Sequence, residues 1–281
     1  MSETKQKTKN SKGAAFTIKK ENSKILKGII ETLAAILSEV EIKVNPKELT
    51  ISAMHPSRIC SLKVTMKKEE FNEFQISGGE SKIGLNLEAL DKILKRANND
   101  YLITLSFEEK DQKLKIRMSK EGSTRSRTFN LSILDIDTEE IPMDNLLQIE
   151  YDSSWKMNMD LLVEAVKDAE IYSEVMNIKA EEAKGLLFSS IGQIGEMEYD
   201  MGEEELIEAN LHGVSSGDYS LAFLKPIVKM NSITETFEMS LKTAFPIKCI
   251  FSILEGGTLS YFLAPRVEDA EFDEVEDGEE F

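Results

Sequence analysis

The side chains that could carry out chemistry are few and widely separated. His55 and His212 have no second His or Cys nearby at metal-ligand spacing, which argues against a zinc site. No phosphate-binding motif of the GxxxxGK[ST] or GxGxxG type is present. Cys60 and Cys249 are too few for a disulfide framework, so they indicate a reducing compartment and fit a core as small apolar residues. The sequence therefore predicts an intracellular protein with no catalytic residues, no metal and no cofactor.

Two carboxylate-rich segments, 135–140 and 203–208, are the remaining candidates for chemistry. Clustered carboxylates can hold a divalent metal for nuclease chemistry. Runs of like charge are more often solvated surface. A metal-dependent nuclease or hydrolase thus stays as the least favoured alternative, which magnesium-dependent DNA cleavage lost on mutation of Asp135 and Asp137 would support.

Cations on predicted helix faces are a more specific signal, because the chain as a whole is acidic, with 34 basic and 51 acidic residues and a net charge of -17. Apolar spacing predicts one-sided helices over 22–37, 87–97, 159–169 and 220–230. On the polar sides of these helices lie Lys24, Lys27, Lys92, Lys95, Arg96, Lys167, Lys225 and Lys229. Lysines on amphipathic helices are commonplace, so solubility is one interpretation. The other is a basic surface that faces a polyanion through phosphate contacts without sequence preference.

The order of elements repeats within the chain. Alternating segments that indicate strands follow each helix, and aligning Leu26 with Leu162 or Leu87 with Leu221 gives offsets of 136 and 134 residues. We therefore expect two α+β domains of similar topology, joined by an extended connector. Gly256-Gly257 predicts a two-residue hairpin turn near the end of the second domain.

Charge and composition mark the predicted limits of the domains. A basic N-terminal arm over 1–14 and an acidic tail over 268–281, with nine carboxylates and no cation, both indicate mobile extensions. Between them we expect domain 1 over 15–131, the connector over 132–147 and domain 2 over 148–267. No apolar run approaches the length of a membrane span, and the N-terminus is not a secretory signal.

Three segments give the chain a resemblance to a known family. They are SYFLAPRVE at 260–268, LNLEALDKILKRA at 85–97 and LDIDTEEIP at 134–142. With them, the region from Phe16 to Glu268 is similar to the proliferating cell nuclear antigen (PCNA) type of DNA sliding clamp. The resemblance implies a ring of three subunits with helices lining the hole, antiparallel sheets outside, and duplex DNA encircled without sequence specificity. It implies no enzymatic activity.

Matching positions with this family place five cations toward the DNA: Lys27, Lys92, Lys95, Lys167 and Lys229. Lys24, Arg96 and Lys225 are added from helix geometry alone. The chain departs from the family pattern at Gly28, Ala34, Glu164 and Ala222, positions that are often basic in the family, and at Pro226, where a proline removes a backbone donor. The four non-basic positions predict a weak hold on DNA.

The resemblance also implies an outer hydrophobic pocket that receives short apolar motifs of partner proteins. Matching positions are Met54, Arg58, Ile59, Leu134, Ile141, Pro142, Pro246, Phe262, Ala264 and Pro265. Core packing is the competing interpretation for Met54 and Pro246 taken singly, and Glu139 stands where an apolar residue is common. The expected partners are a clamp loader, a replicative DNA polymerase, a flap endonuclease and a DNA ligase.

Two segments match the strands through which subunits of this family meet. The segment 123–131 carries Arg125 and Arg127, and the segment 194–201 carries Glu196, Glu198 and Asp200. We expect these strands to pair between subunits with their charges opposed. A subunit of a heterotrimeric or checkpoint-type clamp is the alternative, although both edges on one chain favour self-assembly.

Overall fold

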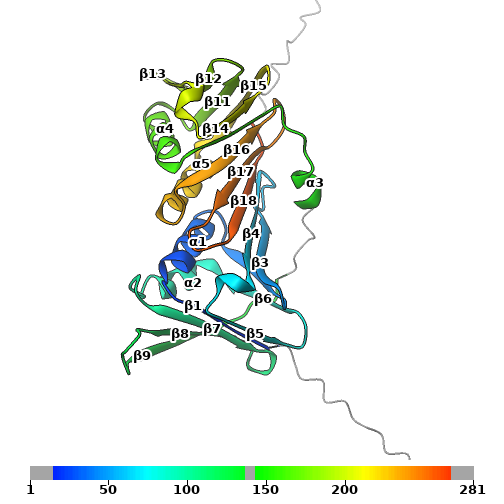
Figure 1. The fold of residues 1–281 in the computed structure, drawn as a ribbon, viewed down its shortest axis with the longest axis vertical. Coiled ribbons are helices and arrows are strands. Elements are labelled where there is room, and N and C mark those ends of the chain that lie inside the picture. The colour runs from blue at the N-terminus through cyan, green and yellow to red at the C-terminus, as the bar shows by residue number, and fades with distance from the viewer. Residues whose placement is uncertain (1–14, 137–142, 267–281) are drawn as a thin grey trace, which may run out of the picture.

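The computed structural model describes residues 15–136 and 143–266 (Figure 1). The first half contains two helices, α1 (Lys24–Ala34) and α2 (Leu87–Leu94), and two short 3-10 helices, η1 (Lys68–Glu70) and η2 (Glu109–Asp111). Its strands are β1 (Ala15–Lys20), β2 (Glu39–Val44), β3 (Glu48–Met54), β4 (Cys60–Lys67), β5 (Glu73–Ser77), β6 (Ser81–Asn86), β7 (Leu102–Glu108), β8 (Lys113–Ser119) and β9 (Ser126–Ser132).

The second half repeats this order after a short helix, α3 (Met143–Leu147). Its helices are α4 (Met159–Tyr172) and α5 (Leu221–Ile227), with 3-10 helices η3 (Glu203–Glu205) and η4 (Val228–Ser232). Its strands are β10 (Ser153–Asn158), β11 (Val175–Glu181), β12 (Gly185–Gly192), β13 (Gly195–Met201), β14 (Glu208–Leu211), β15 (Val214–Ser220), β16 (Thr236–Leu241), β17 (Ile247–Ser252) and β18 (Thr258–Leu263). Each half runs strand, helix, five strands, helix, three strands, so the predicted internal duplication is confirmed.

The sheets show the same duplication. Domain 1 has the strand orders β5-β1-β7-β8-β9 and β4-β3-β2-β6, and domain 2 has the equivalent orders β14-β10-β16-β17-β18 and β13-β12-β11-β15. All the pairings are antiparallel, and β18 pairs with β4, which joins the two halves in one nine-stranded sheet. The equivalents of these two strands, β9 and β13, are the last strands of their own sheets.

The helices lie on one side of the sheets, and α3 lies on the other (Figure 1). Alternate residues of the strands are buried toward the helices, as in β8 with Leu114, Ile116 and Met118. The helices contribute one apolar stripe each, such as Ile25, Ile29 and Leu33 in α1, to a continuous core that spans both halves. We call the buried side of each sheet its core face and the opposite side its outer face.

Helix limits follow from local chemistry. Asn86 caps α2 by accepting a hydrogen bond from the backbone N–H of Ala89 at 2.8 Å. Pro226 lies in α5, which ends one residue later and continues as the 3-10 helix η4. The equivalent helix α2 has eight residues and no proline, so α5, with seven, is only one residue shorter.

Contacts beside the β18–β4 pair also hold the two domains together. Gly28 of α1 leaves room for the buried side chain of Ile233, where an added Cβ would lie 2.7 Å from a methyl carbon. Lys20, which is 5% exposed, donates hydrogen bonds to the carbonyls of Glu70 and Glu255 at 2.8 and 3.3 Å and pairs with the Glu255 carboxylate at 3.4 Å. The loop between β17 and β18 is therefore attached to domain 1.

Two local predictions differ from the structure. The hairpin at Gly256-Gly257 is not a two-residue turn, because Ser252 pairs with Thr258 and five residues form the loop. Glu255, Gly256 and Gly257 all have positive φ there, and buried Ile253 anchors the loop through hydrogen bonds with both glycines. The connector, expected to be extended, contains α3. The limits predicted for the two domains stay predictions.

Candidate nucleic-acid, partner and subunit surfaces

The predicted DNA-facing cations all come from the helical side of the molecule. Lys24 and Lys27 lie in α1, Lys167 in α4, Lys225 in α5 and Lys229 in η4. Lys92 lies in α2, and Lys95 and Arg96 follow its last residue directly. The helices also contact one another, α1 with α2 and α5, and α4 with α5. These cations thus share one side of the molecule across both domains.

Half of these cations, Lys92, Lys95, Lys225 and Lys229, are paired with carboxylates of the same chain. Lys92 pairs with Glu88, and Lys225 of α5 pairs with Glu170 of α4. Glu31 of α1 accepts two lysines, Lys95 at 3.5 Å and Lys229 at 3.7 Å, and so links helices of both domains. This bridge between the two domains was not predicted from the sequence.

Two cations without a carboxylate partner among the described residues, Lys27 and Lys167, differ in what surrounds them. Lys27 donates to the Ala97 carbonyl at 2.9 Å and to the Asn99 side-chain oxygen at 3.0 Å. Lys167 is exposed, but its helix α4 carries four carboxylates and that one lysine. The helical side of the described chain therefore has a mixed charge, which agrees with the weak hold on DNA expected from the sequence.

The ion pairs on the helical side shift the pKa values of two of their members, Lys95 and Glu88. The hydrogen bond with Asp91, 2.8 Å away, together with the charges of Asp91 and Glu31, raises the pKa of Lys95. The hydrogen bond from Lys92 lowers the pKa of Glu88. Both pKa shifts favour the charged forms of Lys95 and Glu88.

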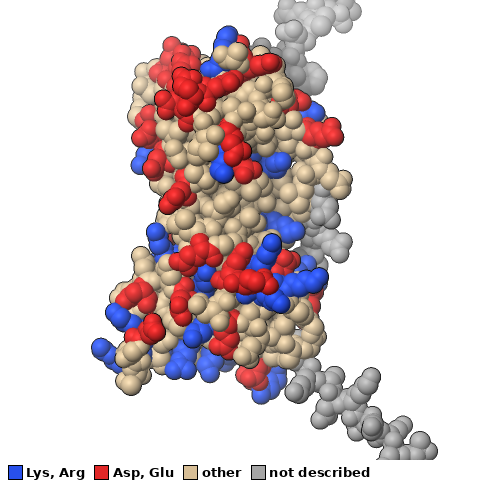
Figure 2. Space-filling view, in the orientation of Figure 1, with Lys and Arg blue, Asp and Glu red and all other residues tan. Residues whose placement is uncertain are grey.

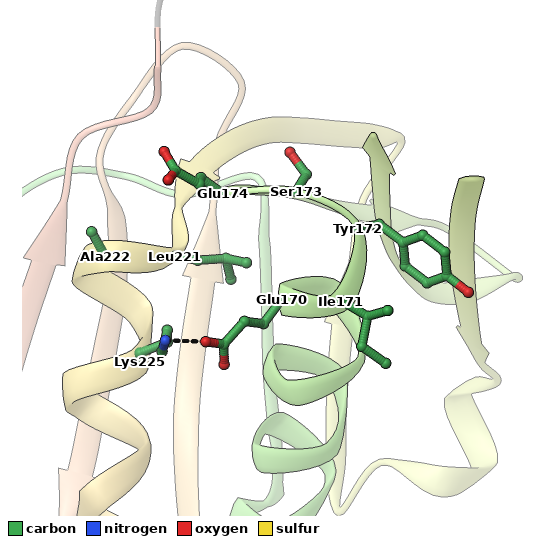
Figure 3. A pocket seen from close by; sticks show the side chains of 8 residues that line it. All are labelled: Glu170, Ile171, Tyr172, Ser173, Glu174, Leu221, Ala222 and Lys225. Atoms are coloured by element: carbon green, nitrogen blue, oxygen red, sulfur yellow. Dashed lines mark hydrogen bonds and ion pairs between the residues drawn. The ribbon is translucent and has the colours of Figure 1, made fainter. Parts of the chain in front are cut away.

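A hollow of about 500 Å³ lies where α4 ends and α5 begins (Figure 3). Its lining includes Ile171, Tyr172 and Leu221, and Lys225 points across it toward Glu170. The Lys225 ammonium is therefore directed at α4. An approaching phosphate would have to compete with Glu170 for this lysine.

The structure brings together one part of the predicted partner pocket. Met54 and Phe262 are both register partners of Ser61, so all three lie on the outer face of the nine-stranded sheet. Ala264 donates its N–H to the carbonyl of Ile59 at 2.8 Å, which brings the end of β18 against the loop before β4. Ile59 is 39% exposed and Phe262 is buried outside the main core.

The other predicted pocket residues lie in several different parts of the structure. Arg58 is an exposed turn residue with positive φ, and Pro265 directly follows Ala264. Pro246 accepts a hydrogen bond from the Tyr151 hydroxyl at 2.9 Å. Ile141 and Pro142, with Glu139, lie outside the described residues. Leu134 does not join the group, because it bridges Gly84 in β6, separated from β18 by β4, β3 and β2.

The two predicted edge strands do not present their charges on the same face. Arg127 of β9 donates to the carbonyl of Arg96 at 2.7 Å and lies over the Tyr101 ring, so it is on the core face. Glu196, Glu198 and Asp200 are exposed on the outer face of β13, because the alternate residues Met197 and Tyr199 pack against the core. In a continuous sheet, neighbouring side chains share a face. Arg127 and these carboxylates would therefore not oppose one another, contrary to the prediction, and Arg125 precedes β9 rather than lying in it.

Two cations on the outer face could oppose the β13 carboxylates, and neither was predicted from the sequence. Lys115 and Arg117 lie on the outer face of β8, where they alternate with buried Leu114, Ile116 and Met118. The period-two pattern of residues 113–119 is the signal that could have identified them.

The remaining candidates for chemistry are dispersed. In the described parts of the chain no three His, Cys, Asp or Glu residues are grouped so that they could hold a metal ion. Both cysteines are buried, as predicted. No helix within residues 15–136 and 143–266 is long and apolar enough to cross a membrane.

Family models agree with this architecture over almost the whole described chain. The model of the N-terminal domain of proliferating cell nuclear antigen matches residues 15–140, and that of the C-terminal domain matches residues 145–266. The chain belongs to the PCNA family.

Relatives and solved structures are consistent with this membership. A DNA polymerase sliding clamp of Thermofilum pendens is 33% identical over 245 residues, covering 86% of this chain and 95% of the relative. One from Pyrococcus horikoshii is 28% identical and covers 90% of this chain and 99% of the relative. Among solved structures, the PCNA2-PCNA3 complex of Sulfolobus tokodaii has a TM-score of 0.79 at 22% identity, over 89% of this chain and 99% of that chain. PCNA of Entamoeba histolytica has a TM-score of 0.80 at 19% identity, over 90% and 99%.

Proposed function

We propose that this PCNA-family chain is a DNA polymerase sliding clamp. Three copies close head to tail into a ring around duplex DNA, and the ring tethers replication and repair enzymes without being an enzyme itself. The observation that carries the proposal is the internal repeat of the sheets. Within one chain β18 pairs with β4, and the equivalent strands β9 and β13 end their sheets. Pairing of β9 in one copy with β13 in the next would repeat the same junction.

The register of β9 with β8 can be compared with that of β18 with β17, which shows the residues of β9 and β18 that are equivalent. Leu131 of β9 pairs with the first buried residue of β8, as Leu263 of β18 pairs with the first buried residue of β17. Arg127 therefore corresponds to Leu259, since each lies four residues earlier in its strand.

The partner strand is aligned in the same way. Leu49 pairs with Met66 of β4, as Leu186 pairs with Met201 of β13, so Tyr199 corresponds to Val64. Leu259 pairs with Val64 inside the chain. Arg127 of one copy would accordingly lie opposite Tyr199 of the next.

Charge on the core face supports this register. The Tyr199 hydroxyl is 3.5 Å from a carboxylate oxygen of Glu164 in α4, and Asp168 of α4 is exposed one helical turn further on. Burial and the charge of Glu164 raise the pKa of Tyr199, so its hydroxyl stays protonated at neutral pH. Arg127 would thus approach a protonated phenol and a carboxylate at the junction.

The hold on DNA would come from encirclement more than from contact. Several of the cations on the helical side are engaged by the chain's own carboxylates, and α4 is acidic. Phosphate contacts set both affinity and salt dependence in sequence-independent binding. A ring with few available cations can move along the duplex while remaining linked to it.

Partner enzymes would dock on the outer face beside β18. Met54 on the outer face, with Ile59 before β4 and Ala264 after β18, provides an apolar surface over buried Phe262 for short hydrophobic motifs. Apolar clusters of this kind commonly mark interaction sites. The proposed users are the clamp loader, the replicative polymerase, the flap endonuclease and DNA ligase.

The mass of the purified chain in solution tests the assembly. Light scattering during size exclusion should give three times the chain mass of 31.7 kDa. Arg127→Glu should give folded monomers because it places two carboxylates together at the junction, whereas Lys82→Glu, at an exposed position of β6, should leave the trimer intact. A trimer that forms only with a second, different clamp chain would favour the heterotrimeric alternative.

A further inference from the structure

The acidic row on the outer face of β13 has no counterpart within its own chain. Glu196, Glu198 and Asp200 are exposed at alternate positions, and none of them forms an ion pair with another described residue. Figure 2 shows acidic side chains gathered over the end of the molecule that holds β12 and β13. This row lies at the strand where the proposed ring would close.

A basic row lies on the outer face of the sheet at the other end of the molecule. Lys115 and Arg117 are exposed on the outer face of β8, the strand next to β9. Neither has a carboxylate within ion-pair distance among the described residues, although the charge of Lys115 contributes to lowering the pKa of Glu108, behind the larger effect of Lys110. Figure 2 shows basic side chains along this end of the molecule.

Only small polar side chains separate β8 from the edge of the sheet on this face. Arg117 pairs with Thr128 of β9, and Lys115 pairs with Asn130. Both β9 residues are exposed. A long side chain on β8 can therefore reach past β9 toward a strand added beside it.

We propose that Lys115 and Arg117 of one copy hold Glu196 and Glu198 of the next copy across β9, and so direct β9 to pair with β13. This inference rests on the proposed ring. With Arg127 opposite Tyr199, the outer-face rows are Arg117, Thr128, Glu198 and Lys115, Asn130, Glu196. Two strand spacings separate the charged residues of a row by about 10 Å, which an extended Arg or Lys and a Glu can span together.

The junction inside the chain lacks this charge pattern. Its equivalent rows are Ile250, Ser260, Lys63 and Lys248, Phe262, Ser61. The complementary charge is therefore confined to the junction that must form between separate molecules. Pairing of β9 with β9 would bring cations together, and pairing of β13 with β13 would bring carboxylates together, so both wrong pairings are disfavoured.

Charge exchange tests the proposal. One variant combines Lys115→Glu with Arg117→Glu, a second combines Glu196→Lys with Glu198→Lys, and a third contains all four substitutions. A control variant combines Lys47→Glu, directly before β3, with Lys82→Glu in β6, which make the same charge change at exposed positions. The trimer-to-monomer dissociation of each is followed by light scattering over a dilution series, with circular dichroism to verify folding.

Each double variant should dissociate at a concentration about tenfold or more above that of the unmodified chain, because two exposed pairs become repulsive. The fourfold variant should assemble nearly as well as the unmodified chain, and the control should not change. Double variants that assemble normally, or a fourfold variant no better than the doubles, would overturn this inference while leaving the ring intact. An unmodified chain that stays monomeric would overturn the proposed function and this inference together.

Discussion

The double ion pair at Glu31 allows a direct test of how the helical side contacts DNA. Glu31 accepts Lys95 and Lys229, at 3.5 and 3.7 Å, and all three side chains are between 41% and 51% exposed. Glu31→Gln keeps the size of the side chain but removes the charge that holds both lysines. The Lys229 ammonium then becomes available to phosphates of an encircled duplex, whereas Lys95 stays paired with Asp91 at 2.8 Å.

The expected change is in the salt dependence of binding. Each added phosphate contact makes the slope of log K against log salt steeper by about 0.9, so one new contact from Lys229 makes it steeper by about 1. The loss in folding stability should stay below about 1 kcal/mol, because these are exposed ion pairs. The assay is fluorescence anisotropy of a short labelled duplex over a series of salt concentrations.

Glu181→Gln is the matched control. Glu181 of β11 also accepts two lysines, Lys179 at 2.8 Å and Lys184 at 2.6 Å, but it lies on a sheet away from the helices. It should leave the slope unchanged although the net charge changes equally. An unchanged slope for Glu31→Gln, or an equal change for both variants, would refute the argument that Glu31 masks DNA-facing cations.

Three further predictions concern the core and the domain junction. Ile233→Ala removes a fully buried side chain that packs on Gly28, so chemical denaturation should show a loss of about 2–5 kcal/mol, and a loss under 1 kcal/mol would contradict this packing. Lys20→Ala leaves two carbonyls and the Glu255 carboxylate without their donor and should lower the free energy of unfolding by about 1–3 kcal/mol. Lys68→Ala, in an exposed pair with Glu69, should lower it by less than about 0.5 kcal/mol. Equal effects of the two substitutions would argue against the interdomain contact. Burial raises the pKa of Cys60 to about 11 and also raises that of Cys249. Since the thiolate is the reacting form, native protein at pH 8 should take up almost no iodoacetamide, whereas unfolded protein should be labelled at both cysteines. Rapid labelling of the native protein would contradict the burial of the two thiols.

The helices and the duplication could be predicted from the sequence because both depend on local spacing. Leu87, Leu90 and Leu94 form a buried stripe at helical period, and its copy is found 134 residues later with Leu221, Leu224 and Val228. The loop at 253–257 was mispredicted because a buried anchor, Ile253, and contacts with domain 1 determine its length. Neither is visible in the dipeptide Gly256-Gly257.

For the charged surfaces too, the sequence shows which residues are charged, whereas long-range contacts determine which charges meet. Which residues are cationic was evident, but pairing between Lys95, Lys229 and Glu31 depends on packing of helices from different domains. The face on which Arg127 lies depends on the register of β9 with β8, which no local pattern gives. Leu134 was misplaced for a similar reason, since its bridge to Gly84 is a long-range pairing.

Retention on DNA of different topology tests the central claim most directly. Rings assembled on a nicked circular plasmid should remain with it through gel filtration at a salt concentration that removes phosphate-bound proteins. Cutting the plasmid at a single site should release them, because a linear duplex has free ends. Equal retention before and after the cut would show that the chain is held by surface contacts and would contradict encirclement.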